Sequence, residues 1–160
     1  MSLSVNPTAQ AHPPHHAAPT RARAIVVDNS ADYVDVVLAL LDFHEFIDLV
    51  GRASNVDEAL QLVEDLRPEL VLVDLGFPGA YILITALARV GAFTGIQVVA
   101  MSEADSLPVQ APQLILKVRA FIRKTRFREE FPLVFRALLD VPWPSQRIAS
   151  AKLGFGEGCS

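Results

Sequence analysis

Polar residues follow three apolar segments of the chain and one further predicted strand, and their types could perform chemistry together. They are Asp28 with Asn29 after 24–27, Asp74 after 70–73, Ser102 after 96–101, and Lys124 after 118–123. A carboxylate at the carboxyl end of a buried strand lies where open α/β sheets place their active sites. We therefore expect these side chains to converge at one edge of a sheet.

An aspartate, a metal ion, a hydroxyl and a lysine together suit phosphoryl transfer. Clustered carboxylates repel one another, and a hard cation such as Mg²⁺ relieves that repulsion through oxygen ligands. One carboxylate can then attack phosphorus while the cations neutralise charge on the transferring oxygens. Each residue alone has a plainer explanation, since an Asp or Ser at a strand end often caps the next helix. Their order along a repeated strand–helix pattern makes the joint signal more specific.

The segments between these residues alternate between apolar runs and helical periodicity. The runs predict strands at 24–28, 46–50, 69–74, 96–101 and 118–123. Helical spacing predicts four helices. The apolar face of the first consists of Tyr33, Val36, Val37, Leu40 and Leu41. The second starts at the capping-box-like Asn55-x-x-Glu58 and stops before Pro68, the third covers 81–90 and ends at Gly91, and the last covers 131–139.

The segment 103–117 is the exception to this regular alternation. A helix is due there, but Pro108 and Pro112 fall inside it. A proline inside a helix removes a hydrogen bond and clashes with the preceding turn. We expect a short or distorted helix, confined to about 111–117.

Five strands alternating with helices predict an α/β fold with a parallel sheet and right-handed crossovers. The favoured architecture is a flavodoxin-like three-layer sandwich with strand order 2-1-3-4-5. The first and third strands are then neighbours, which brings Asp28 beside Asp74, with Ser102 entering from the fourth strand.

Length and composition predict one domain with tails. The chain has 160 residues, of which 51% are hydrophobic and 20% charged, enough for one sizeable core. Residues 1–22 have the composition of a disordered tail, 23–140 of the folded domain, and 141–160 of a linker or tail.

The charge and the hydropathy pattern narrow the classes of partner. The net charge of −4 argues against direct nucleic-acid binding by this chain. No apolar stretch approaches the roughly 20 residues of a membrane span, and the N-terminus does not have the pattern of a signal peptide. We expect a cytoplasmic protein without a membrane partner.

Taken together, the chain resembles the receiver (CheY-like) domain of a two-component response regulator, over roughly 24–140. The acidic pair of that family falls on Asp28-Asn29, its Asp-x-x-x-Pro-Gly segment on 74–79, its Ser/Thr on Ser102, its Lys on Lys124, and its aromatic switch position on Phe121. The stretch 48–60 further resembles receivers that precede helix-turn-helix output domains.

The resemblance implies a role for each of these residues. Asp74 would accept a phosphoryl group from a histidine kinase or phosphotransfer protein, with Ser102 and Lys124 on the phosphoryl oxygens. Asp28, Asp74 and the main-chain carbonyl of Gly76 would hold Mg²⁺. A turn of Phe121 would then switch contacts with a downstream protein or a second copy. Such a domain is no enzyme beyond its own phosphorylation and dephosphorylation.

Two departures from the family pattern keep a second interpretation open. Asn29 replaces an acid that commonly ligates the metal, so Mg²⁺ affinity should fall, and Pro108 and Pro112 interrupt the helix most involved in output. The alternative is a receiver-like interaction or dimerisation module that acts without phosphorylation. A flavin carrier of the same fold is disfavoured because no Gly-rich phosphate loop follows the first strand.

Overall fold

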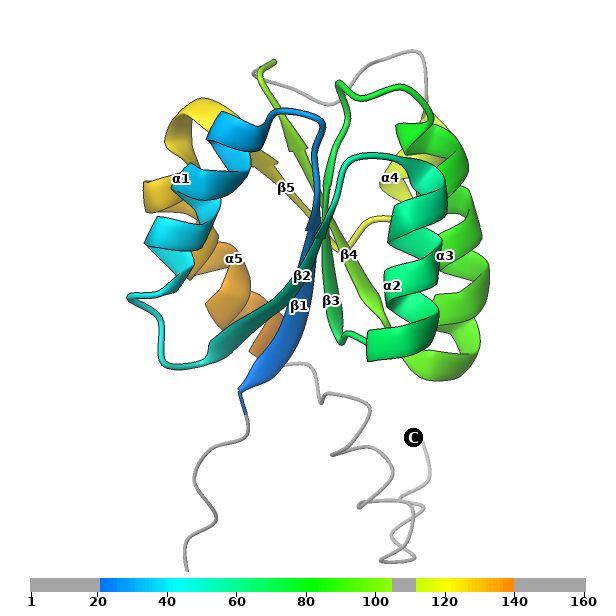
Figure 1. Cartoon of the computed structure of the whole chain (residues 1–160), viewed down its shortest axis with the longest axis horizontal. Coiled ribbons are helices and arrows are strands. Elements are labelled where there is room, and N and C mark those ends of the chain that lie inside the picture. Colours follow the sequence, from blue (N-terminus) through cyan, green and yellow to red (C-terminus); the bar gives the residue numbers. More distant parts are fainter. Residues whose placement is uncertain (1–20, 105–111, 140–160) are drawn as a thin grey trace, which may run out of the picture.

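The computed structural model describes residues 21–104 and 112–139, and these form a parallel five-stranded sheet between two layers of helices (Figure 1). The strand order is β2-β1-β3-β4-β5. The strands are β1 (Ala22–Val27), β2 (Ile47–Ala53), β3 (Leu70–Asp74), β4 (Gln97–Ser102) and β5 (Ala120–Arg123). Both the predicted fold class and the predicted strand order are confirmed.

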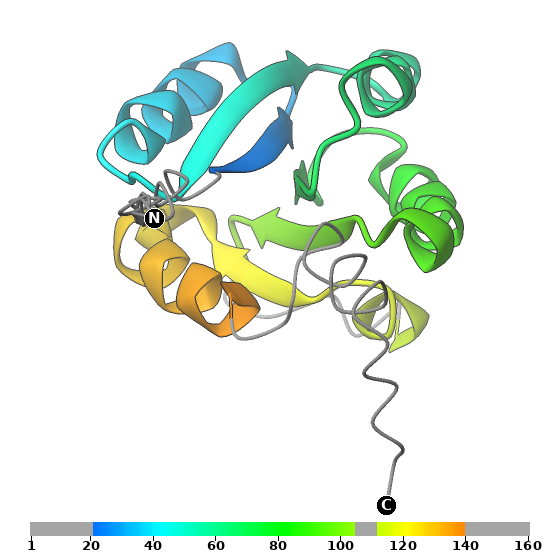
Figure 2. The ribbon, with the colours of Figure 1, turned by 90° about the horizontal axis from the view of Figure 1, so that it is seen from below.

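The helices divide between the two faces of the sheet, as the view along the strands shows (Figure 2). α1 and α5 cover one face, and α2, α3 and α4 cover the other. Their bounds are α1 (Ala31–Leu41), α2 (Val56–Leu66), α3 (Ala80–Thr94), α4 (Pro112–Ile115) and α5 (Phe127–Leu139), with a 3-10 turn η1 (Lys124–Arg126) before α5. None of the helices in the described residues is long and apolar enough to cross a membrane.

The hydrophobic core consists of two clusters separated by the sheet. One packs α1 and α5 on the sheet and contains Val37 and Phe131, while the other packs α2 and α3 and contains Ala59 and Leu83. All five residues of β3 are buried, as expected for a central parallel strand covered on both faces. This burial carries Asp74, the last residue of β3, into the interior.

The predicted start of α2 is confirmed, with one change in its hydrogen bonds. Asn55 is the N-cap, and its side chain accepts a hydrogen bond from the Glu58 N–H at 3.0 Å. Glu58 reaches back one residue further than a capping box requires, because it accepts from the N–H of Ser54 at 2.8 Å. These bonds lower the pKa of Glu58, the Ser54 N–H most of all.

The prediction that Gly91 ends the third helix is wrong. α3 continues to Thr94 and is capped by Gly95, whose φ of 75° is left-handed. Gly91 serves a close contact instead, since a Cβ there would lie 2.9 Å from the main-chain oxygen of Ile96. A glycine inside a helical pattern therefore marked the approach of β4 rather than a helix end.

The other helices differ from the prediction in detail. α1 buries Val34, Val37 and Leu41 and leaves Val36 51% exposed, so its apolar face is turned from the predicted one. α5 begins at Phe127, before the predicted 131. Of the segment 103–117, the described part contains the short helix α4, as expected, whereas 105–111 lies outside the described residues. Of the predicted tails 1–22 and 141–160, residues 1–20 and 141–160 lie outside the described residues too, whereas Ala22 begins β1.

Candidate functional site

Strand pairing brings the predicted site residues to the carboxyl edge of the sheet. β1 and β3 pair with Val27 opposite Val73, so the next residues, Asp28 and Asp74, are neighbours. β4 and β5 pair with Ser102 opposite Arg123, so Lys124 follows just beyond this pair. The parallel register alone therefore places two carboxylates, a hydroxyl and an ammonium at one edge.

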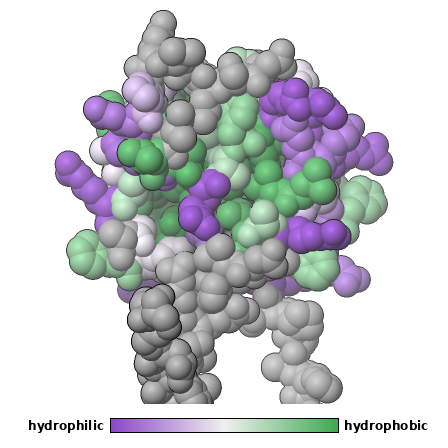
Figure 3. Space-filling model, turned by 180° about the vertical axis from the view of Figure 1, so that it is seen from behind, coloured by the Kyte–Doolittle hydropathy of each residue, from purple (hydrophilic) through white to green (hydrophobic). Residues whose placement is uncertain are grey.

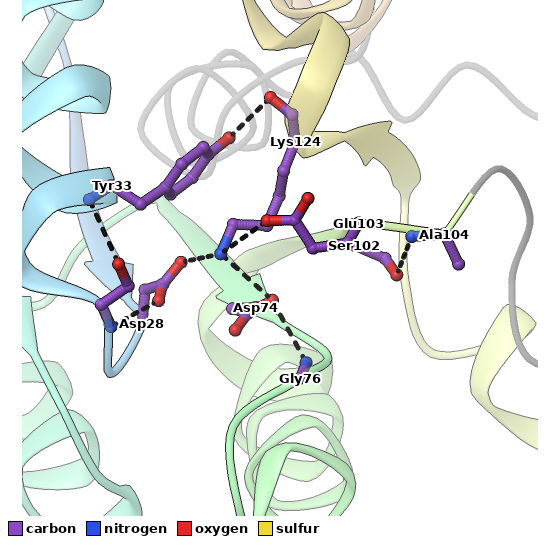
Figure 4. Close-up of polar contacts among 9 residues, drawn as sticks. Asp28, Tyr33, Asp74, Gly76, Ser102, Glu103, Ala104 and Lys124 are labelled. Carbon is purple, nitrogen blue, oxygen red and sulfur yellow. Dashed lines mark hydrogen bonds and ion pairs between the residues drawn. The ribbon is translucent and has the colours of Figure 1, made fainter.

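Lys124 lies between the two aspartates (Figure 4). Its Nζ is 2.7 Å from Oδ2 of Asp28 and 3.6 Å from Oδ1 of Asp74. The side chains are 6% exposed in Lys124, 0% in Asp28 and 7% in Asp74. Glu103 adds a third carboxylate at 3.9 Å, but its side chain is 73% exposed. One buried cation thus serves two buried anions.

The carboxyl of Asp74 is held in an unfavourable environment for a charge. Burial raises its pKa above the ordinary value, a hydrogen bond from the Gly76 N–H opposes that rise, Asp28 adds to it, and Lys124 opposes it. The net effect is a raised pKa. A carboxylate in this state gains from any further positive charge that enters the pocket.

Asp28 is hydrogen-bonded through one oxygen and ion-paired through the other. Its Oδ1 accepts a hydrogen bond from the Ser30 N–H at 2.8 Å. Its Oδ2 is buried, and within the described part of the chain its partner is the Lys124 ammonium, 2.7 Å away. This oxygen depends on ion pairing alone and retains lone pairs for another cation.

Of the remaining predicted residues, Gly76 contacts the cluster through its N–H, whereas, in the part of the chain that the structure describes, Ser102 and Asn29 lie near it without a hydrogen bond to Asp28, Asp74 or Lys124. The hydroxyl of Ser102 accepts a hydrogen bond from the Ala104 N–H at 3.0 Å, and it is turned to that amide rather than to Lys124 (Figure 4). Asn29 is exposed and lines a neighbouring cavity of about 250 Å³ together with Arg52. Gly76 is exposed at the turn after β3.

Phe121, the predicted switch residue, is half-buried in β5 at the edge of the sheet. It lines a shallow cavity with Arg123, Glu130, Leu133 and Val134. Hydrophobic side chains gather in the middle of the face on which β5 lies (Figure 3), and Leu133 is 68% exposed there. The aromatic side chain therefore connects the interior of the sheet with an accessible surface.

The donor set at the carboxyl edge fits a hard divalent cation. Two buried carboxylates stand at this edge, and one of them accepts a hydrogen bond from the main chain of the Gly76 turn. Oxygen ligands of this kind suit Mg²⁺, which keeps several waters of its own. In residues 21–104 and 112–139 no group of three His, Cys, Asp or Glu side chains is placed to hold a metal, so main-chain and water oxygens would complete the shell.

Sequence reasoning missed two residues of this site, Tyr33 and Glu103. The Tyr33 ring lies over the Lys124 ammonium, 4.0 Å from Nζ to the ring centroid. Its hydroxyl donates to the main-chain oxygen of Lys124 at 3.4 Å. In the sequence Tyr33 is one apolar position of a helix, and no pattern connects it to a lysine 91 residues away.

The chain is similar in sequence to part of two longer proteins. No family model matches the chain. It is 40% identical over 57 residues to protein-glutamate methylesterase/protein-glutamine glutaminase 3 of Myxococcus xanthus. This alignment covers 36% of this chain and 16% of that protein. It is 30% identical over 126 residues to the corresponding protein of Moorella thermoacetica, which covers 63% of this chain and 30% of that protein. The chain thus spans less than a third of either relative.

Solved structures extend the likeness to most of the chain. The isolated receiver domain of RcsB from Salmonella enterica serovar Typhimurium superposes with a TM-score of 0.67 at 16% identity, covering 78% of this chain and 92% of that one. The receiver domain of NarL from Mycobacterium tuberculosis gives 0.58 at 24% identity, covering 76% and 96%. The response regulator domain of Thermotoga maritima CheB gives 0.61 at 20% identity, covering 77% and 99%. The chain has the fold of the receiver domains of two-component response regulators.

Proposed function

We propose that this domain works in two-component signal transduction by accepting a phosphoryl group on Asp74 from a histidine kinase or phosphotransfer protein. The observation that carries the proposal is the meeting of Asp28, Asp74 and Lys124 at the carboxyl edge of the sheet. The raised pKa of Asp74 supports it, because carboxyl groups with perturbed pKa values cluster at functional sites.

The transfer step follows from the positions of these groups. An oxygen of Asp74 forms a bond to phosphorus as the bond from phosphorus to the donor's imidazole nitrogen breaks, and the electron pair leaves with the imidazole. The Lys124 ammonium stands 3.6 Å from Oδ1 of Asp74 and can follow the phosphoryl oxygens. Asp28, Asp74 and the Gly76 carbonyl would hold Mg²⁺, with the uncharged amide of Asn29 as a weaker ligand, and the ion would supply further positive charge.

The same step supplies a route for switching. The Ser102 hydroxyl accepts only a local hydrogen bond from Ala104, so rotation toward a phosphoryl oxygen costs little. Phe121 lies next to Ile122 in the edge strand β5 and lines the shallow cavity. Movement of Ser102 with an inward turn of Phe121 would reshape this surface for a downstream protein or a second copy.

The proposed role is that of a signalling domain and not of an independent enzyme. The relatives named as methylesterases and glutaminases are much longer than this chain, which aligns with 16% and 30% of the two compared above. The proposal includes a cytoplasmic location and no direct contact between this domain and nucleic acid, in keeping with its net charge of −4.

A phosphorylation-independent interaction module is the second candidate. It is favoured by Asn29, which brings no charge to the pocket, and by the short distance between the ammonium of Lys124 and Asp28, which already pairs one carboxylate without a metal. In that case the β5 edge would serve constitutive contacts.

Intact-mass spectrometry separates the two candidates. The full chain is incubated with a small phosphodonor, with and without Mg²⁺, beside the variants Asp74→Asn and Asp28→Asn. We expect the mass of one phosphoryl group on the wild type with Mg²⁺, none on Asp74→Asn, and a slower gain on Asp28→Asn. A wild type that gains no mass, or an adduct that persists in Asp74→Asn, would overturn the first candidate.

A further inference from the structure

We propose that Tyr33 is a positioning residue for the Lys124 ammonium and thereby sets how tightly the pocket binds a divalent cation. This inference rests on the proposed function of the same site, but its tests do not require phosphoryl transfer. The observation behind it is the ring of Tyr33 lying 4.0 Å from the Lys124 Nζ, on the side of the ammonium that the aspartates leave open.

Three contacts fix the Tyr33 ring in this place. The main-chain N–H of Tyr33 donates to the hydroxyl of Ser30, the N-cap of α1, at 3.3 Å. The edge of Phe127 meets the ring at 90°, with 6.4 Å between centroids. The hydroxyl donates to the main-chain oxygen of Lys124. The ring is therefore held from α1, from α5 and from the lysine's own backbone.

Ser30 also connects the ring to the acidic side of the pocket. Its N–H donates to Oδ1 of Asp28, while its hydroxyl accepts from the N–H of Tyr33. The short segment from β1 into α1 thus places both the carboxylate and the ring that flank Lys124. A shift of one moves the other, so the position of the ammonium is set by this segment as a unit.

An aromatic face suits this position better than a polar group would. The Lys124 side chain is 6% exposed, so little water reaches its ammonium. The face of the ring attracts a cation, with more effect at a desolvated site than at an exposed one. It adds no anion to a pocket that already has two buried carboxylates. Tyr33 can therefore hold the ammonium in place without adding to the repulsion between Asp28 and Asp74.

The ammonium held in this way stands where a metal would bind. Its nearest partner is Oδ2 of Asp28, a buried oxygen 2.7 Å away. A divalent cation that binds this oxygen must displace Lys124 from it. Loss of the ring contact should make that displacement easier, so the dissociation constant for Mg²⁺ should fall.

The test compares two variants of the full chain with the wild type by NMR. Tyr33→Phe keeps the ring and removes the hydroxyl, while Tyr33→Leu removes the ring. The first measurement is the chemical shift of the Lys124 ε-methylene protons, which the ring current of Tyr33 moves upfield. The variant Lys124→Arg assigns this signal. The second is a Mg²⁺ titration followed by backbone amide shifts. Tyr33→Met, with a longer flexible side chain, replaces Tyr33→Leu if the latter does not fold.

We expect Tyr33→Phe to keep the upfield shift and to bind Mg²⁺ within twofold of the wild type. We expect Tyr33→Leu or Tyr33→Met to lose the shift and to bind Mg²⁺ about fivefold more tightly, as a cation–π contact of ordinary strength implies. The inference would be overturned by any of three results. These are an unchanged Mg²⁺ dissociation constant in the variant without the ring, a Tyr33→Phe variant that behaves like Tyr33→Leu, and no Mg²⁺ binding by the wild type. Failure of phosphorylation alone would overturn only the proposed function.

Discussion

Two consecutive cations at the end of β5, Arg123 and Lys124, form ion pairs of different kinds. Arg123 pairs with Glu130 of α5, which accepts from its main-chain N–H at 2.9 Å and from Nε at 2.6 Å. Lys124 is shared by Asp28 and Asp74. The first pair is partly exposed, at 30% and 19%, whereas the second group is almost entirely buried.

The difference separates a structural contact from a reactive one. Glu130 pairs with Arg123, accepts two hydrogen bonds from it, lies near Arg126 and has access to water. Burial alone would raise its pKa, but the bonds from Arg123 outweigh that effect and lower it. Asp74 shares the cation Lys124 with Asp28 and is almost fully buried, and its pKa is raised. The Arg123–Glu130 ion pair connects α5 to the sheet, whereas Asp74, which shares its cation, is the group that we propose accepts a phosphoryl group.

The largest expected effect comes from removing the shared cation. Lys124→Met leaves two buried carboxylates without a partner, and we expect the free energy of unfolding to fall by about 3 kcal/mol. Urea denaturation measures it. Arg123→Met is the matched control at the preceding residue and should cost less, because its partner remains partly hydrated. Equal losses in the two variants would remove the distinction between the pairs.

Next in size is Glu130→Gln, which breaks the structural pair. We expect a loss of about 1.5 kcal/mol, at the low end for a hydrogen bond to a charged group since water screens this pair. The pKa of Glu130 is lower in the folded chain, so its contribution is present above the ordinary value of 4.5 and is lost as the pH falls below it. The wild type and the variant should therefore converge in acid, and a gap that widens in acid would contradict this account.

A smaller effect of opposite sign is expected for Asp74→Asn. The raised pKa means that the folded chain binds this proton more readily than the unfolded chain, so the ionised carboxyl destabilises the fold above its ordinary value of 3.8. Removing the charge should raise the free energy of unfolding at neutral pH by about 1 kcal/mol. Thermal unfolding at neutral and acidic pH would show a gain that shrinks as the pH falls; a loss at neutral pH would refute it.

Glu103→Gln should have the smallest effect. Its carboxylate lies 3.9 Å from Lys124 Nζ but its side chain is 73% exposed, and exposed pairs contribute only a few tenths of a kcal/mol. Thermal unfolding of this variant should match the wild type closely. A loss approaching that of Lys124→Met would mean that the cation is shared by three carboxylates rather than two.

Much of the fold could be predicted because it depends on local patterns. The three runs 24–27, 70–73 and 96–101 are continuously apolar or nearly so, which is typical of strands covered on both faces of the sheet. The helix ends were harder. Gly91 has the residue type of a helix end, but the chain continues because the main chain of Ile96 passes close to it. That contact lies between segments and leaves no local signal.

The candidate site shows the same division. Residue type and position at strand ends were enough to single out Asp28, Asp74 and Lys124, and parallel pairing then brings them together. Which anion Lys124 approaches more closely could not be predicted, because it depends on side-chain geometry across three strands. The same holds for Tyr33, whose aromatic ring reads as core until Lys124 is placed against it.

The sequence by itself determined the layered α/β fold and the edge of the sheet at which chemistry can occur, because hydrophobic periodicity and strand ends are properties of short segments. Only the tertiary structure decided how charge is distributed at that edge. It gave Arg123 a carboxylate of its own, left Lys124 to be shared by two, and placed Tyr33 over the ammonium. Burial and distances below 4 Å between remote residues set these interactions, and both arise only when the chain is packed.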